Sequence, residues 1–351
     1  MEVIEVLEKL CNLSGVSGGE VNVANYVGEL LNKIFDKVTK DRLGNIIAFK
    51  KGKGGVENKK IMIAAHMDEI GLMVKGINKE GFLHFIKIGG IDVRTLLAQE
   101  VIVHGKKDIL GIIGAKPPHL QKSDEHKKSI RIEDLYIDVG LTENQVKKYI
   151  NIGDFITINR KFVHLAGNNV AGKALDNRAG IATMIQCMNY LKELQHDLDI
   201  YFVATVQEEV GLRGAITSTY NIIPDIGIAI DVGHGKTPDI SEEDTIELGK
   251  GPGIALGANI HPKIYKKLVE IAEKNNIPYQ LEVNPSSSGT DAWAMQVTRS
   301  GVPTGLLSIP LRYMHTSVEM LNIKDLLFTS KLLALFIEGL RGMDLEEWLC
   351  F

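Results

Sequence analysis

The sequence predicts an α/β protein in which a small β-domain is inserted into a larger α/β domain. After about residue 165, helical and strand-like apolar patterns alternate along the chain, as in a doubly wound sheet. From about residue 69 to residue 164, short β-type runs are separated by glycine and charged turns. Because the opening segment also ends in a strand that looks buried, residues 1–68 and 165–351 are assigned to one domain and residues 69–164 to the insert.

The first part of the chain predicts two helices and two strands. Apolar residues at helical spacing indicate helices at about 2–13 and 19–35. Strands follow at 45–50 and 61–66, on either side of the polar segment KGKGGVENKK. This segment lacks the GK[ST] ending of a phosphate-binding loop, so we interpret it as a solvated turn.

The insert is expected to consist of strands. Its β-type runs are GLMVKGI, FLHFIKI, EVIVHGK, ILGIIGA, LYIDVG and DFITINR. The segment at 116–129 has no apolar period, so we expect a surface loop there, with a smaller chance of contact with a substrate.

The last part of the chain predicts alternating helices and strands. A helix follows Asp176, and the apolar run YFVATVQEE is expected to form a strand up to Glu209. The remaining expected elements are a helix at 211–219, a strand at 225–231, a helix at 262–275, the strand YQLEV, a helix at 291–297, the strand PTGLLSI and a helix at 323–341.

Composition indicates an ordinary globular protein. The 351 residues exceed what one core usually holds, which agrees with two domains. A 44% hydrophobic content, a 24% charged content and a net charge of -4 give no reason to expect a nucleic-acid partner. Cys11, Cys187 and Cys350 are far apart and lack CxxC spacing, so neither a disulfide framework nor a thiolate zinc site is expected.

The N-terminus carries an acidic amphipathic pattern rather than the basic and apolar regions of a signal peptide. No apolar run approaches the roughly 18 residues that a membrane span needs. We therefore expect a soluble protein of the cytoplasm, without a membrane partner.

Metal-binding side chains recur where the apolar elements of the larger domain begin or end. The carboxyl ends of parallel strands meet at one edge of a sheet, where α/β proteins hold ligands. Three strands end in such side chains, a helix opens with one and a histidine follows a further strand. The residues are His66, Asp176, Glu208, Glu209, Asp231 and His315.

Each of these residues also has an ordinary interpretation. Asp176 alone is best interpreted as a helix N-cap, and Asp231 could start an Asx-turn. Glu208 and Glu209 could be solvated residues at a strand end, and His315 a surface or core histidine. Taken together they favour a metal site, because clustered carboxylates repel one another unless cations compensate them.

His66 and Asp68 form an HxD pair. Residues two apart on an extended segment point to the same side, so the Asp68 carboxylate is expected to orient the His66 ring. A plain surface pair is the alternative.

Several longer motifs occur in a fixed order along nearly the whole chain. They are AAHMDEIGLMV, KPPHL, ALDNRAG, VQEEVGLRGA, AIDVGHG, GTDA and YMHTSVEM. With them the chain resembles the M42 family of metallo-aminopeptidases, which includes the tetrahedral and glutamyl aminopeptidases. The resemblance implies a zinc-peptidase-like mixed sheet with helices on both faces, and an enzyme that removes N-terminal residues from short peptides.

The resemblance also implies roles for individual residues. His66 and Asp231 would bind one divalent metal ion, Glu209 and His315 a second, and Asp176 would bridge them. Glu208 would be the general base for a water shared by the metals, an assignment that agrees with neighbouring strand residues pointing to opposite sides. The mixed ligands suit zinc first, with cobalt or manganese as alternatives. The peptide from Asp176 to Asn177 is expected to be cis.

By the same resemblance, the insert would drive dimerisation and the dimers would assemble into a tetrahedral dodecamer. Two other functions stay open at this point. Glu208 and Glu209 could be the paired carboxylates of a glycoside hydrolase, or the site could be a non-catalytic metal-binding scaffold. The segment at 286–296 could contact substrate or provide only an Asp N-cap.

Overall fold

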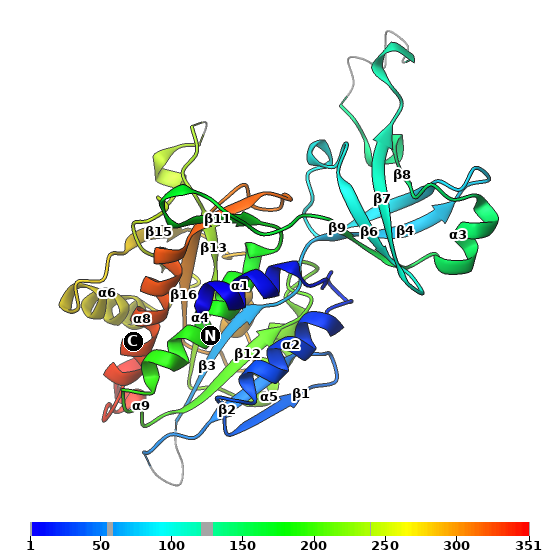
Figure 1. Ribbon diagram of the computed structural model, residues 1–351. Coiled ribbons are helices and arrows are strands. Elements are labelled where there is room, and N and C mark those ends of the chain that lie inside the picture. The colour runs from blue at the N-terminus through cyan, green and yellow to red at the C-terminus, as the bar shows by residue number, and fades with distance from the viewer. Residues whose placement is uncertain (1, 55–58, 121–128, 239, 351) are drawn as a thin grey trace.

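The computed structural model describes residues 2–54, 59–120, 129–238 and 240–350. Figure 1 shows two parts, a large α/β body and a smaller β-barrel that projects from it. Most of the loop expected at 116–129 lies outside the described residues.

The body contains one mixed sheet of eleven strands among the described residues. Its strands are β1 (Lys37–Lys40), β2 (Ile46–Lys50), β3 (Lys60–His66), β10 (Val163–His164), β11 (Asn169–Gly172), β12 (Asp199–Thr205), β13 (Ile226–His234), β14 (Gly253–Gly257), β15 (Gln280–Asn284), β16 (Thr304–Arg312) and β17 (Glu319–Asn322). They follow the order β1-β2-β12-β3-β13-β16-β17-β11-β10, with β14 pairing both β16 and β15.

The centre of this sheet is parallel and buried. Strands β12, β3, β13 and β16 run parallel, with Thr205 opposite His66 and Asp231 opposite Ser308. Strand β3 is apolar almost throughout because both of its faces are covered. The outer strands β1, β2, β14 and β17 make antiparallel pairs, so the sheet is mixed rather than wholly doubly wound.

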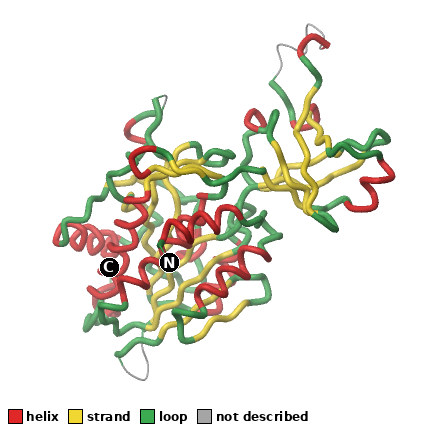
Figure 2. The backbone as a smooth tube through the Cα atoms, viewed as in Figure 1, coloured by secondary structure: helices red, strands yellow, loops and turns green. Residues whose placement is uncertain are grey.

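Helices cover both faces of the sheet, as Figure 2 shows. They are α1 (Val3–Asn12), α2 (Val21–Leu31), α4 (Leu175–Leu191), α5 (Arg213–Ile222), α6 (Pro262–Lys274), α7 (Asp291–Gln296), α8 (Ile323–Gly339) and α9 (Leu345–Leu349). Helices α1, α4 and α8 pack into one large core, whereas α5 and α7 close a smaller core on the other face. The predicted α/β fold with helices on both faces is confirmed.

The smaller part is a closed barrel with strand order β4-β5-β8-β7-β6-β9. It has its own apolar core, separate from those of the body. Its elements are β4 (Gly71–Ile77), β5 (Leu83–Ile88), β6 (Glu100–His104), β7 (Asp108–Ala115), β8 (Leu135–Asp138), the helix α3 (Glu143–Tyr149) and β9 (Phe155–Ile158). The sequence did not predict α3, which buries little besides Val146.

One predicted strand end was wrong, and it matters for the site. Strand β12 ends at Thr205, so Glu208 and Glu209 lie beyond it in a turn. Gln207 has a φ of 56°, and the N–H groups of Gly211 and Leu212 donate to the Glu208 carbonyl. The argument that neighbouring strand residues point to opposite sides therefore does not apply to this glutamate pair.

Among the described residues, no helix combines the length and the apolar character needed to cross a bilayer.

Candidate metal centre

The candidate ligands come together at the carboxyl edge of the parallel strands. His66 is the last residue of β3, and Asp231 lies on the neighbouring strand β13. Asp176 lies at the start of α4, and His315 follows β16. The edge expected from the sequence thus holds side chains that are up to about 250 positions apart in the chain.

Three of these side chains form a first donor group. The His66 Nε2 atom lies 3.1 Å from Asp176 Oδ1 and 3.7 Å from Asp231 Oδ1. All three side chains are buried, and their donor atoms lie within 4.8 Å of one another.

A second donor group lies beside the first. The His315 Nε2 atom is 3.3 Å from Glu209 Oε1 and 3.4 Å from Asp176 Oδ2. These donor atoms also lie within 4.8 Å of one another. Asp176 therefore belongs to both groups, and it presents a different carboxylate oxygen to each histidine.

Glu208 lies next to the first group without belonging to either group. Its Oε2 atom is 3.9 Å from His66 Nε2. Burial is the largest cause of a pKa of about 10 for Glu208; the charge of His66 opposes the rise, and the charge of Asp231 adds to it. Glu208 is therefore a buried carboxyl that readily holds a proton in this environment.

The charges in the site fit divalent cations. Burial raises the pKa of Asp231 well above its ordinary value, and burial likewise raises that of Glu209. Burial alone would also raise the pKa of Asp176, but hydrogen bonds with His315 and His66 keep it low. Carboxylates and imidazoles this close together need protons or cations for compensation, and they are the ligands that zinc, cobalt and manganese accept.

The start of α4 shapes the Asp176 position. Asp176 and Asn177 have non-helical backbone angles, Ala174 is the N-cap, and the Asp176–Asn177 peptide is cis. The interpretation of Asp176 as an N-cap is therefore wrong. The Asn177 amide donates to the Ile230 carbonyl on β13, which ties this turn to the strand that carries Asp231.

Asp68 lies beside His66, on the side that the HxD pattern predicts. The His66 Nδ1 atom is 3.1 Å from the Asp68 backbone oxygen and 3.6 Å from its carboxylate. The carboxylate also accepts hydrogen bonds from Ser17 Oγ and from the N–H groups of Glu208 and Glu209, at 2.6, 3.1 and 3.2 Å. Asp68 thus holds the turn that presents both glutamates.

Sequence reasoning missed several residues around the site. The buried Glu319 accepts the N–H groups of Asp176 and His315, both at 3.1 Å. Gly90, in the insert, must be glycine because a Cβ there would lie 2.5 Å from His315 Nδ1. Only the position of Glu319 in the motif YMHTSVEM gave any signal in the sequence.

The segment at 286–296 is only partly as expected. Thr290, not Asp291, caps α7, so the Asp N-cap interpretation is wrong. Asp291 is buried and accepts a hydrogen bond of 2.6 Å from Thr205. Burial raises its pKa to about 6.

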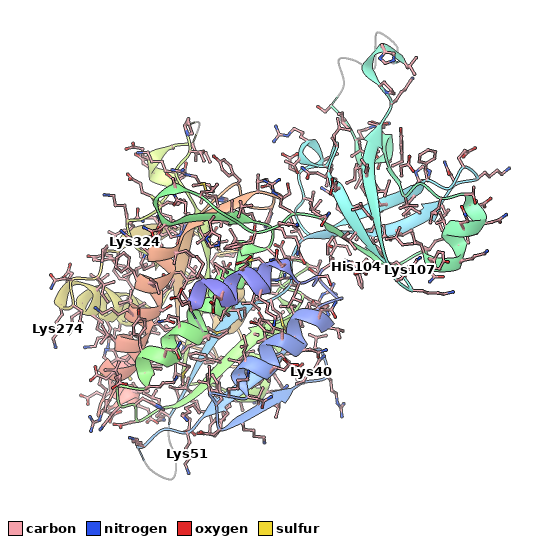
Figure 3. All side chains as sticks on the ribbon, viewed as in Figure 1. Lys40, Lys51, His104, Lys107, Lys274 and Lys324 are labelled. Carbon is pink, nitrogen blue, oxygen red and sulfur yellow. The ribbon has the colours of Figure 1, made fainter. Side chains whose placement is uncertain are left out.

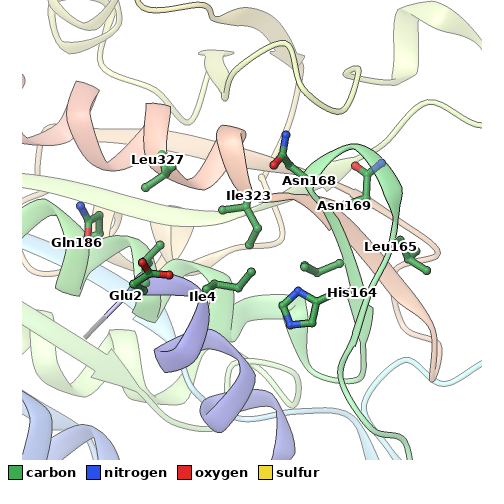
Figure 4. A pocket seen from close by; sticks show the side chains of 11 residues that line it. Glu2, Ile4, His164, Leu165, Asn168, Asn169, Gln186, Ile323 and Leu327 are labelled. Atoms are coloured by element: carbon green, nitrogen blue, oxygen red, sulfur yellow. The ribbon is translucent and has the colours of Figure 1, made fainter.

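The donor groups open into a cavity of about 520 Å³. Strands β13, β15 and β16 and the segment 288–290 contribute to the rest of its wall. Another cavity of about 520 Å³ lies against α1 and α8, where Ile4, Leu165, Ile323 and Leu327 contribute to its lining. Figure 4 shows the labelled side chains of this second cavity, which holds neither donor group.

Other histidines have ordinary structural roles. His104, labelled on the barrel in Figure 3, has Asp108 Oδ1 2.8 Å from Nδ1 and Thr157 Oγ1 2.9 Å from Nε2. His196 Nδ1 lies 2.9 Å from the Leu198 carbonyl. His234 is exposed on the wall of the cavity that holds the donor groups and belongs to neither of these groups.

An α/β sheet whose strand ends hold two donor groups joined by one carboxylate defines the class as a metal-dependent peptidase. The family model described as M42 glutamyl aminopeptidase matches residues 44–332, and the chain belongs to this family. It is therefore an aminopeptidase, a hydrolase that acts on peptide bonds, and its family is metal-dependent.

Known relatives match the chain over nearly its full length. The lysyl aminopeptidase of Pyrococcus furiosus is 39% identical, over 97% of this chain and 98% of that protein. An aminopeptidase structure from the archaeon Desulfurococcus kamchatkensis has 41% identity and a TM-score of 0.90, over 99% of this chain and 96% of that one. The TET1 peptidase of Pyrococcus horikoshii, which can assemble into a tetrahedron or a large octahedral shell, has 34% identity and a TM-score of 0.85, over 96% and 100%.

Proposed function

We propose that this aminopeptidase removes N-terminal residues from short peptides with the help of two divalent cations. The observation that carries the proposal is the shared carboxylate, because one oxygen of Asp176 faces His66 and the other faces His315. His66, Asp176 and Asp231 would hold one cation, and Asp176, Glu209 and His315 the other. Zinc is our first choice, with cobalt and manganese as alternatives.

Two such cations would activate a shared water as the nucleophile, polarise the scissile carbonyl and stabilise the negative charge that develops on its oxygen. Glu208 is the general base in this proposal. It takes a proton from the attacking water and delivers it to the leaving amine. Its position supports this role, because its Oε2 atom lies 3.9 Å from His66 Nε2 and Glu208 belongs to neither donor group.

Asp68 acts in this mechanism as a positioning residue. By accepting the N–H groups of Glu208 and Glu209, it fixes the turn from which one glutamate would bind metal and the other would move the proton. Glu319 plays a similar part for Asp176 and His315.

We also propose that residues 69–164 form a separate domain and that the chain works as a homo-oligomer. The barrel has its own core, which supports a separate folding unit. The tetrahedral assembly of the Pyrococcus horikoshii relative supports a tetrahedral dodecamer built from dimers here. Such a shell would admit short unfolded peptides and exclude folded proteins.

The glycoside hydrolase alternative fits this geometry less well. Glycosidase carboxyls face a sugar from opposite sides and need no metal, whereas Glu208 and Glu209 share one turn beside two histidines.

Metal removal tests the proposal. Dialysis against a chelator should abolish hydrolysis of aminoacyl-anilides, and zinc or cobalt should restore it with about two ions bound per chain. Full activity in protein verified as metal-free by elemental analysis would refute the mechanism.

A Glu208→Gln variant separates an enzyme from a metal-binding scaffold. We expect it to bind the same number of metal ions as the wild type while kcat falls by about 10² to 10⁴. Glu29→Gln, on the exposed side of α2, is the matched control and should leave kcat unchanged. Unchanged turnover in the metal-loaded Glu208 variant would argue for a scaffold or for a different base.

A further inference from the structure

The cavity into which the donor groups open also holds a carboxyl group outside those groups. Glu282, on β15, lines the same cavity as the donor groups and belongs to neither of them. Its Oε2 atom is buried and has no hydrogen-bond partner among the residues that the structure describes. A buried carboxyl oxygen without a partner is costly, so its environment fits a ligand that supplies a donor.

The position of Glu282 is linked to the metal centre through β13. Asp231 and Gly233 lie two residues apart on this strand and share a face, about 7 Å from each other. A Cβ at Gly233 would lie 3.1 Å from Glu282 Oε1, so the glycine leaves the room that this carboxyl occupies. The carboxyl therefore lies beside the metal centre, along the strand that carries Asp231.

The rest of the wall offers little to neutralise Glu282. Neither lysine nor arginine is among the described residues that line this cavity, and the exposed His234 is the one cationic candidate outside the donor groups. Ser308 donates a hydrogen bond to the carboxyl, but burial has the larger effect and raises the pKa of Glu282. An acidic ligand side chain would meet repulsion here, and an apolar one would leave Oε2 unpaired.

We infer that Glu282 selects a basic N-terminal residue, lysine or arginine, by pairing its buried carboxylate with the cationic end of that side chain. This inference rests on the proposed function, because it assumes that the scissile carbonyl lies at the metal centre. A side chain that extends from there along β13 has about 7 Å to cover, which matches the four-carbon stem of lysine. The charge that the substrate brings compensates a buried carboxylate for which the described part of the chain supplies no partner at Oε2.

The test compares substrates whose N-terminal side chains differ in charge, on metal-loaded protein. We expect kcat/KM to be higher for lysyl- and arginyl-anilides than for norleucyl- and glutamyl-anilides. Glu282→Gln should lower the ratio of lysyl to norleucyl kcat/KM by about tenfold to hundredfold, because it removes a charge-assisted hydrogen bond. Glu243→Gln, an exposed acid outside the cavity lining, is the control and should leave the ratio unchanged.

Calorimetric titration with free L-lysine and L-norleucine gives a second readout that needs no turnover. The wild type should bind lysine more tightly, and Glu282→Gln should lose that difference. A wild type that hydrolyses neutral residues without preference for basic ones would overturn the inference and leave the proposed function intact. An equal loss on all substrates in Glu282→Gln would make Glu282 merely structural. If the metal-loaded wild type hydrolyses nothing, the proposed function fails, and the titration alone decides whether the cavity selects a cation.

Discussion

Glu319 shows how a single residue outside the donor groups can position them. Burial and the charge of Asp176 raise its pKa well above the ordinary value. Its two carboxyl oxygens accept one N–H group each, from Asp176 and from His315. These residues lie at the centre and at one end of the candidate metal site, so Glu319 fixes the spacing between them.

Replacement of Glu319 by glutamine should loosen both contacts. A glutamine has one oxygen acceptor, so it leaves one buried N–H group facing its own NH2 group. We expect the free energy of unfolding to fall by about 1–3 kcal/mol and metal affinity to fall about 10- to 100-fold. Chemical unfolding and zinc competition would measure the two effects. Wild-type zinc affinity in this variant would contradict the positioning role.

At the scale of elements, helix α4 is fixed to its neighbours by one buried arginine. Arg178 donates to the carbonyl groups of Leu10 and Leu13, at and just beyond the end of α1, both at 2.6 Å. It also donates to Met67 O, just after β3, and pairs with the buried Glu69 at 3.0 Å. Because Arg178 follows Asp176 by two residues, this network fixes the helix start that carries the shared carboxylate.

Loss of this arginine should destabilise the whole body. Arg178→Met leaves Glu69 with Lys173 as its remaining cationic partner and removes the hydrogen bond to the Met67 carbonyl. We expect a loss of about 3–5 kcal/mol in urea unfolding, and a smaller loss for Arg178→Lys, which keeps the charge. Arg341→Met removes the exposed contact with Asp197 and should cost at most about 1 kcal/mol. Equal losses in the two Met variants would disprove this account.

At the scale of the whole molecule, the barrel presents an apolar surface away from its core. Leu110 and Ile112 point outward from β7 and are each 54% exposed. Ile102, on β6, lies opposite Leu110. An exposed row of large apolar side chains fits contact with another subunit, which agrees with the proposed role of the insert in assembly.

A double substitution tests that role. Leu110→Lys with Ile112→Lys places two charges on this row, so we expect the mass measured by light scattering to fall to a smaller species. Val21→Lys, on the exposed side of α2, is the control and should keep the wild-type mass. An unchanged mass in the double variant would show that the interface lies on another surface.

The sequence predicted the fold class and most elements correctly, because apolar periodicity is a local property. The helix expected at 262–275 is found at Pro262–Lys274, and the strand expected at 45–50 is found at Ile46–Lys50. It also identified the side chains that the structure gathers at the carboxyl edge of the sheet. Those residues lie at the ends of elements, where an apolar run stops or starts, so the sequence pattern identifies them.

Only the tertiary structure decided how the side chains around the site are held and what they leave unpaired. Asp68 binds the N–H groups of the Glu208–Glu209 turn across 140 positions of the chain, and Glu319 reaches Asp176 across 143. Glu282 alternates with exposed neighbours on β15 and looks in sequence like any solvated strand residue. Hydrogen bonding and burial depend on which distant segments come into contact, and local periodicity does not specify those contacts.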